Sequence, residues 1–254
     1  MVGVAILAGA AVADAARLGA AMAALQFGIG ATNDLVDAPN DAGHKPGKPI
    51  PAGLVSREAA GIVAGGGFAA GLALTAGFGS GVLALSIVVI AIGLAYDLRL
   101  KGTALSWLPF AVGIPILPVF GWLGAAGELP SAFAILVPAA VMAGAALAIA
   151  NGLADLERDR AAGVGSIAIA LGREQAWAVQ AILVLVVAGA AIASAALLGD
   201  RGGSWIVVAV AALVPLAGAG YGRGGGPGRR ERAWEVEAVG IAALGIAWTW
   251  AVLG

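Results

Sequence analysis

Several residue types that carry common enzyme chemistry are scarce or missing in this chain of 254 residues. There is no cysteine, which excludes disulfide bonds and thiolate metal sites and leaves oxygen atoms as the metal ligands to consider. Charged residues make up only 11% of the sequence. With 61% hydrophobic residues and a mean hydropathy of +0.97, the composition excludes an ordinary water-soluble globule and predicts an integral membrane protein.

Long apolar runs account for most of the chain. A helix needs about 20 residues to cross a hydrocarbon layer that is roughly 30 Å thick. Runs of about this length predict an all-α, multi-pass membrane protein with spans near residues 15–33, 54–76, 79–97, 103–125, 130–154, 173–198, 204–221 and 235–253. Residues 2–12 are too short to span, and because no basic residue precedes them we expect part of the mature protein rather than a signal peptide.

The basic residues are unevenly distributed over the predicted loops. When alternate loops are assigned to opposite sides of the membrane, every Lys and Arg except Arg17 and Arg201 falls on one side. Loops rich in Lys and Arg stay in the cytoplasm, so this side is predicted to be cytoplasmic. We expect the run Arg223–Arg232, which is rich in glycine and arginine, to form a mobile loop that contacts anionic lipid headgroups.

Two acidic clusters follow apolar runs on the predicted cytoplasmic side. The first contains Asn33, Asp34, Asp37 and Asp41, and the second contains Asn151, Asp155, Glu157 and Asp159. Residues three or four apart share one face of a helix, so each cluster can direct its carboxylates to one point. A single cluster of this kind is commonly a set of solvent-exposed acids at a helix end. Two matching clusters at a membrane edge favour bound divalent metal.

The matching clusters also suggest an internal repeat. Each begins with Asn at the inner end of a predicted span and is followed by a cytoplasmic segment and another span. This arrangement predicts a single domain, residues 1–254, built from two similar halves of about residues 1–125 and 126–254, with a central site between them.

Basic residues near the clusters can complete an anion site. Lys45 and Lys48 follow the first cluster in a stretch rich in glycine and proline, and Lys101 lies in the next cytoplasmic turn. Mg²⁺ is commonly shared between carboxylates, water and substrate phosphate, so a diphosphate is the expected ligand, and a membrane setting makes its organic part a lipid. His44 is the only histidine, and its place in the same stretch favours a solvent-facing residue over a catalytic base.

At these residues the chain resembles the UbiA superfamily of intramembrane prenyltransferases, over roughly residues 15 to 253. The first cluster is similar to the first Asp-rich motif of that family, and Asp155-x-Glu157-x-Asp159 with Gly163 and Ser166 is similar to its second. Three further stretches carry the resemblance: Lys45-Pro46-x-Lys48-Pro49, Ile50-Pro51-Ala52-Gly53, and Tyr96 with Leu100, Lys101 and Thr103.

This resemblance implies a bundle of eight to nine transmembrane helices around a central cavity, with two Mg²⁺ ions and an isoprenyl diphosphate at the cytoplasmic mouth. It implies that one ion is held by Asp34, Asp37 and Asp41 and the other by Asp155 and Asp159. Lys48 and Lys101 would bind the diphosphate with help from Lys45 and Tyr96, and Asn33 and Asn151 would bind donor or metal. The implied catalytic set is Asp34, Asp37, Asp155, Asp159 and Lys101.

The implied reaction transfers an isoprenyl group through an allylic carbocation to a hydrophobic, aromatic or lipid acceptor. An apolar, aromatic cavity would shield the cation from water. Its candidate lining residues are Phe27, Trp107, Phe110, Phe120 and Trp122. The expected location is the plasma membrane of a prokaryote, and no nucleic acid partner is expected. Two alternatives stay open: a terpene cyclase that uses the same donor without an acceptor, and a divalent-cation carrier, which the apolar mid-span positions disfavour.

Overall fold

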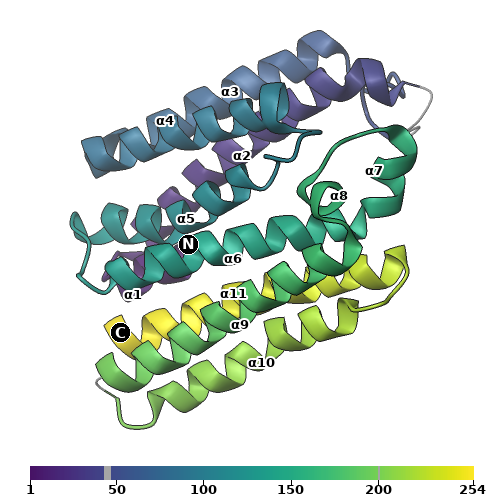
Figure 1. Ribbon diagram of the computed structural model, residues 1–254. Coiled ribbons are helices and arrows are strands. Elements are labelled where there is room, and N and C mark those ends of the chain that lie inside the picture. The colour runs from purple at the N-terminus through teal and green to yellow at the C-terminus, as the bar shows by residue number, and fades with distance from the viewer. Residues whose placement is uncertain (43–46, 200) are drawn as a thin grey trace. The chain divides into compact units, whose positions relative to one another are not determined.

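The computed structural model describes residues 1–42, 47–199 and 201–254, and in this part of the chain every regular element is helical (Figure 1). The predicted all-α fold class is therefore confirmed. The elements are α1 (Val2–Leu7), α2 (Val12–Asp41), α3 (Arg57–Thr75), η1 (Ala76–Phe78), α4 (Ser80–Ala95), η2 (Tyr96–Leu100), α5 (Leu108–Ala126), α6 (Phe133–Ala154), α7 (Leu156–Ala162), α8 (Ile167–Leu171), α9 (Arg173–Leu198), α10 (Ser204–Gly222) and α11 (Pro227–Leu253).

Within the described residues, 7 helices are long and apolar enough to cross a membrane. They are Arg57–Phe78, Ser80–Leu100, Leu108–Ala126, Phe133–Ala154, Arg173–Leu198, Ser204–Gly222 and Pro227–Leu253. Each matches a predicted span, which confirms an integral membrane protein. The remaining predicted span, 15–33, lies inside the 30-residue helix α2, where Arg17, Gln26 and Asn33 lower the mean hydropathy.

The chain forms two compact units. Unit 1 comprises Met1–Arg99 and Phe120–Glu128, and unit 2 comprises Leu100–Val119 and Leu129–Gly254. The division therefore passes through α5, between residues 119 and 120. These bounds show which residues pack together, and they do not compare the two halves with each other. The single domain built from two similar halves therefore stays a prediction.

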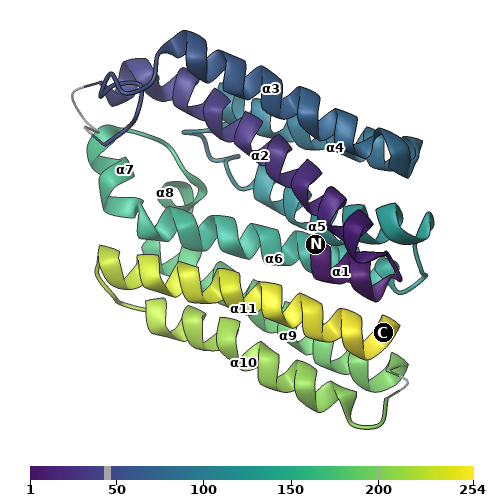
Figure 2. The ribbon, with the colours of Figure 1, turned by 180° about the vertical axis from the view of Figure 1, so that it is seen from behind.

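In unit 1, helices α2, α3 and α4 lie side by side in both views (Figures 1 and 2). Gly67 permits the close approach of α3 to α2, because a Cβ atom at this position would lie 2.7 Å from the carbonyl oxygen of Ala24 and 2.9 Å from the amide nitrogen of Gly28. Small residues of this kind let membrane helices pack backbone to backbone. Next to Ala24, Leu25 of α2 is fully buried.

In unit 2, α6 packs against α9 and α11, and α10 packs against both of those helices (Figure 2). Helix α6 is the most enclosed of the candidate spans. In its most apolar stretch 56% of the residues are buried, and residues 143–150 are buried without a break. A helix that is apolar on all sides is expected in such a central place. Its C-terminal end leads directly into the second acidic cluster.

Candidate functional site

Unit 1 contains an open hollow of about 590 Å³ at the C-terminal ends of α2 and α4. It is lined by Gln26, Phe27, Ile29, Gly30, Ala31, Asn33, Asp34, Lys48, Val63, Tyr96 and Asp97. One part of this lining is polar and carries both acidic and basic groups, whereas the residues from earlier turns of α2 are largely apolar. The hollow can therefore accommodate a charged group together with a hydrocarbon chain.

Asn33 and Asp97 bring the ends of two helices together in this hollow. The Asn33 side-chain amide donates a hydrogen bond of 2.7 Å to Oδ1 of Asp97, which is buried. Asp97 lies in the single π-helical turn η2 that ends the α4 span. Such turns redirect side chains and are frequent at functional sites. The turn also places Tyr96, a predicted substrate-binding residue, in the lining.

Lys48 pairs with the first acidic cluster. Its Nζ atom lies 2.5 Å from Oδ1 of Asp34. This hydrogen bond raises the pKa of Lys48 above its ordinary value, and the negative charges of Asp34, Asp41 and Asp37 act in the same direction, while partial burial opposes them. Lys48 is therefore held as a cation beside three carboxylates, of which Asp41 is buried.

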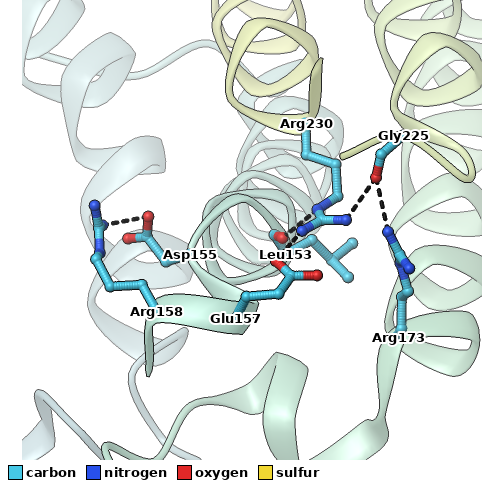
Figure 3. A network of polar contacts seen from close by, with 7 residues as sticks. All are labelled: Leu153, Asp155, Glu157, Arg158, Arg173, Gly225 and Arg230. Atoms are coloured by element: carbon cyan, nitrogen blue, oxygen red, sulfur yellow. Dashed lines mark hydrogen bonds and ion pairs between the residues drawn. The ribbon is translucent and has the colours of Figure 1, made fainter. Parts of the chain in front are cut away.

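The second acidic cluster occupies the junction between α6 and α7. Asp155 separates the two helices, and the backbone amides of Asp155 and Asp159 donate to the carbonyls of Asn151 and Asp155 at 3.2 and 2.9 Å. The side chains of Asn151, Asp155 and Asp159 thus follow one another at helical spacing. Asp155 forms an ion pair with the exposed Arg158 (Figure 3).

Glu157 and Arg230 depart from the expectations. Glu157 does not join the neighbouring carboxylates but pairs with Arg230, so it points away from Asp155 (Figure 3). The prediction of a mobile loop over residues 223–232 is wrong for its second part, because α11 begins at Pro227 and Arg230 is buried. Proline at the first helical position favours that start.

The segment that carries Lys101 meets the loop that follows the second cluster. Within unit 2, the amide of Gly165 donates to the carbonyl of Gly102 at 3.1 Å. The two motif residues of this loop have structural uses: Gly163 ends α7 with a left-handed conformation (φ 66°), and the Ser166 hydroxyl accepts from the amide of Ile169 at the start of α8. Lys101 itself is exposed.

The donor atoms available at both clusters suit Mg²⁺, which prefers carboxylate oxygens and keeps several waters. Among the described residues, no three acidic or histidine side chains converge on one point. One or two carboxylates per ion are enough when phosphate oxygens complete the coordination, so the residues fit the ion. Lys45 and His44 lie outside the described residues, so their predicted roles stay predictions.

A model of the UbiA prenyltransferase family matches residues 1–237, which is most of the chain. The chain belongs to this family. The resemblance to UbiA proteins is thereby confirmed, and the family is one of prenyltransferases. Digeranylgeranylglyceryl phosphate synthase of Methanopyrus kandleri is 33% identical over 164 residues, which are 63% of this chain and 59% of that protein. The match thus spans about three fifths of the length of this curated relative.

Two solved structures share the UbiA fold. One, of a digeranylgeranylglyceryl phosphate synthase, is 15% identical, has a TM-score of 0.77 and covers 99% of this chain and 91% of its own. The other, a UbiA homologue from Archaeoglobus fulgidus bound to GPP and Mg²⁺, is 18% identical, has a TM-score of 0.75 and covers 97% of this chain and 93% of its own. At these identities the likeness establishes the fold of this family member.

The structure also shows functional candidates that the sequence pattern did not single out. Asp97 directly follows Tyr96 in the sequence, but only its burial and its bond to Asn33 give it a role. Gln26 shares the lining with Asn33, and its spacing of two helical turns was the available signal. Of the predicted aromatic lining residues, Phe27 borders the hollow, whereas Phe120 is fully buried in packing.

Proposed function

We propose that this protein transfers an isoprenyl group from a prenyl diphosphate to a hydrophobic, aromatic or lipid acceptor in a Mg²⁺-dependent reaction. The observation that carries the proposal is the hollow of unit 1, which joins Lys48, Asp34 and Asn33 to an apolar stretch of α2. Membership of the UbiA family supports the same reaction class. Mg²⁺, when bound, would neutralise diphosphate charge as the bond between carbon and oxygen breaks.

The residues of unit 1 have distinct tasks in this proposal. Asp34, Asp37 and Asp41 hold metal, and Asn33 orients the donor from its fixed position against Asp97. Lys48 contributes a positive charge that binds the diphosphate oxygens of the donor. Phe27 and its apolar neighbours exclude water from the reactive carbon, since an allylic cation that meets water is lost as alcohol.

The residues of unit 2 supply a second set of groups to the same reaction. Asp155 and Asp159 hold a second metal ion, Asn151 binds donor or metal, and Lys101 binds diphosphate. This assignment rests on the similarity of the two motifs in the sequence. We further propose that the site faces the cytoplasm from the plasma membrane of a prokaryote, because the basic loops follow the acidic clusters.

The experiment supplies the purified protein in detergent with Mg²⁺, prenyl diphosphates from dimethylallyl to geranylgeranyl, and either a membrane lipid extract or a prenylglyceryl phosphate. The latter is chosen because two curated relatives are named digeranylgeranylglyceryl phosphate synthase. Mass spectrometry should find an acceptor that has gained one prenyl unit. Prenyl hydrocarbons formed without any acceptor would instead indicate a cyclase. The absence of diphosphate release with every donor would contradict both.

A further inference from the structure

Arg230 differs from the other arginines around the start of α11. Arg229 and Arg232 are exposed, whereas Arg230 is only 4% exposed. Its Nε and Nη1 atoms donate hydrogen bonds of 2.6 Å to the carbonyl oxygens of Leu153 and Gly225, and Nη2 donates to the Glu157 carboxylate (Figure 3). A buried guanidinium is tolerated when its donors find such acceptors.

Two of these acceptors flank Asp155 in the sequence. Leu153 lies two residues before it, in the last turn of α6, and Glu157 lies two residues after it, in the first turn of α7. The last carbonyls of a helix lack partners within the helix and carry partial negative charge, which a cation compensates. The planar guanidinium offers donors in a fixed geometry, so it ties the end of α6 to the start of α7.

We propose that Arg230 is a positioning residue for the second acidic cluster: it fixes the junction at which Asp155 sits and so presents Asp155 and Asp159 to a metal ion. This inference rests on the proposed function, in which these two carboxylates hold metal. Arg230 acts through Leu153 and Glu157, since Asp155 pairs with Arg158. It also explains why Glu157 stands apart from the neighbouring acids.

Arg173 provides a matched control. Its Nη2 atom donates to the same Gly225 carbonyl at 2.7 Å, but no bond to Leu153 or Glu157 is seen for it among the described contacts. If Arg230 only held the backbone at Gly225, replacing either arginine would have the same effect. If it positions the acidic cluster, only the Arg230 variant would change metal binding.

The test compares Arg230→Met and Arg173→Met in the full-length protein in detergent. Mn²⁺ binding is followed by electron paramagnetic resonance, and the Mg²⁺ concentration for half-maximal diphosphate release is measured separately. Because loss of an outer partner of a metal ligand typically costs 10–100-fold in affinity, Arg230→Met should weaken one Mn²⁺ site by about that factor and Arg173→Met by less than about twofold. Equal effects, or unchanged Mn²⁺ binding in Arg230→Met, would overturn the proposal.

Glu157→Gln keeps the test decisive if Arg230→Met does not fold. This variant retains the shape of the side chain and the backbone contacts of Arg230 but removes the charge. It should weaken the same Mn²⁺ site in the same direction, and unchanged affinity would again overturn the proposal. Wild-type protein that binds Mn²⁺ but releases diphosphate from no donor would contradict the proposed function, while the comparison of Mn²⁺ affinities would still decide the role of Arg230.

Discussion

Asn33 of α2 is hydrogen-bonded to the buried carboxylate of Asp97, 64 residues later in the chain, at a distance of 2.7 Å. This bond joins the first acidic cluster to the π-helical turn that carries Tyr96. A hydrogen bond between two side chains holds both of them in one orientation. It therefore fixes where Asn33 presents its remaining amide atoms.

We predict that Asn33→Ala and Asp97→Ala will lower kcat/KM for the donor by similar factors and that the double variant will be little worse than either single one. A coupling of about 0.5–1.5 kcal/mol is expected for a side-chain hydrogen bond. A double-mutant cycle on diphosphate release measures it. Additive losses would show that the two residues act separately.

Lys48→Met should raise KM for the prenyl diphosphate far more than it lowers kcat, because it removes a charge that faces phosphate in the bound state as well as in the transition state. Steady-state kinetics over a range of donor concentrations separate the two parameters. Arg57→Met offers a control, since Arg57 is an exposed basic residue that does not line the hollow. A similar KM in both variants would remove Lys48 from the donor site.

The pH dependence of Lys48 follows from its partners. Asp34 raises the pKa of Lys48 in the folded protein. The stability that their ion pair contributes is therefore fully present below the unfolded-state pKa of about 10.4, and it is lost as pH rises through the higher folded-state pKa. Asp34→Asn removes the largest cause of the increase. Because Asp34 is also a proposed metal ligand, the readout is Lys48 itself: we expect Lys48 to lose its proton at a lower pH in that variant, as measured by the pH dependence of its side-chain chemical shifts in donor-free protein. Coincident profiles would contradict the pairing.

Asp37→Ala and Asp155→Ala should each abolish turnover, since both are assigned as direct metal ligands from different units. Both variants should still insert and remain monodisperse in detergent, because Asp37 and Asp155 lie only half-buried at helix ends. Mn²⁺ titration should show one site lost in each variant. Near-normal activity of either variant at saturating Mg²⁺ and donor would contradict the assignment of two ions.

Hydropathy located the span ends well where the apolar run itself stops at a glycine and poorly where a helix continues into charged sequence. Helix α9 begins and ends as predicted, at Arg173 and Leu198, between Gly172 and Gly199. Helix α11 begins at Pro227 rather than near residue 235, because its first turns carry Arg230 and other charged residues that a search for apolar runs omits.

The candidate site was predictable in its residue types but not in its pairings. Spacing alone placed Asn33, Asp34 and Asp37 on neighbouring turns. It could not show that Asp97 would approach Asn33 or that Glu157 would turn to Arg230, because both contacts join residues more than sixty positions apart. Such pairings depend on how helices pack, which local periodicity does not contain.

Gly67 offers a test of how closely α2 and α3 must pack to form the hollow. In Gly67→Ala the new methyl group would meet the backbone of Ala24 and Gly28 at less than 3 Å, so the helices must separate, which costs about 1–3 kcal/mol. Gly66→Ala is the control, because its Cβ atom meets nothing within 4 Å. Reversible unfolding in mixed detergent measures the difference.

Donor binding should be affected in the same way as stability, by Gly67→Ala and not by Gly66→Ala. Because α2 carries Asn33 and Asp34, a shift of α2 away from α3 changes the distance of both residues from Val63 of α3, which also lines the hollow. Gly67→Ala should therefore raise KM for the prenyl diphosphate as well as lower stability, whereas Gly66→Ala should leave KM unchanged and should not lower stability, since alanine favours a helix more than glycine does. Loss of stability in Gly67→Ala with an unaltered KM would mean that the helix contact holds the fold without shaping the donor site.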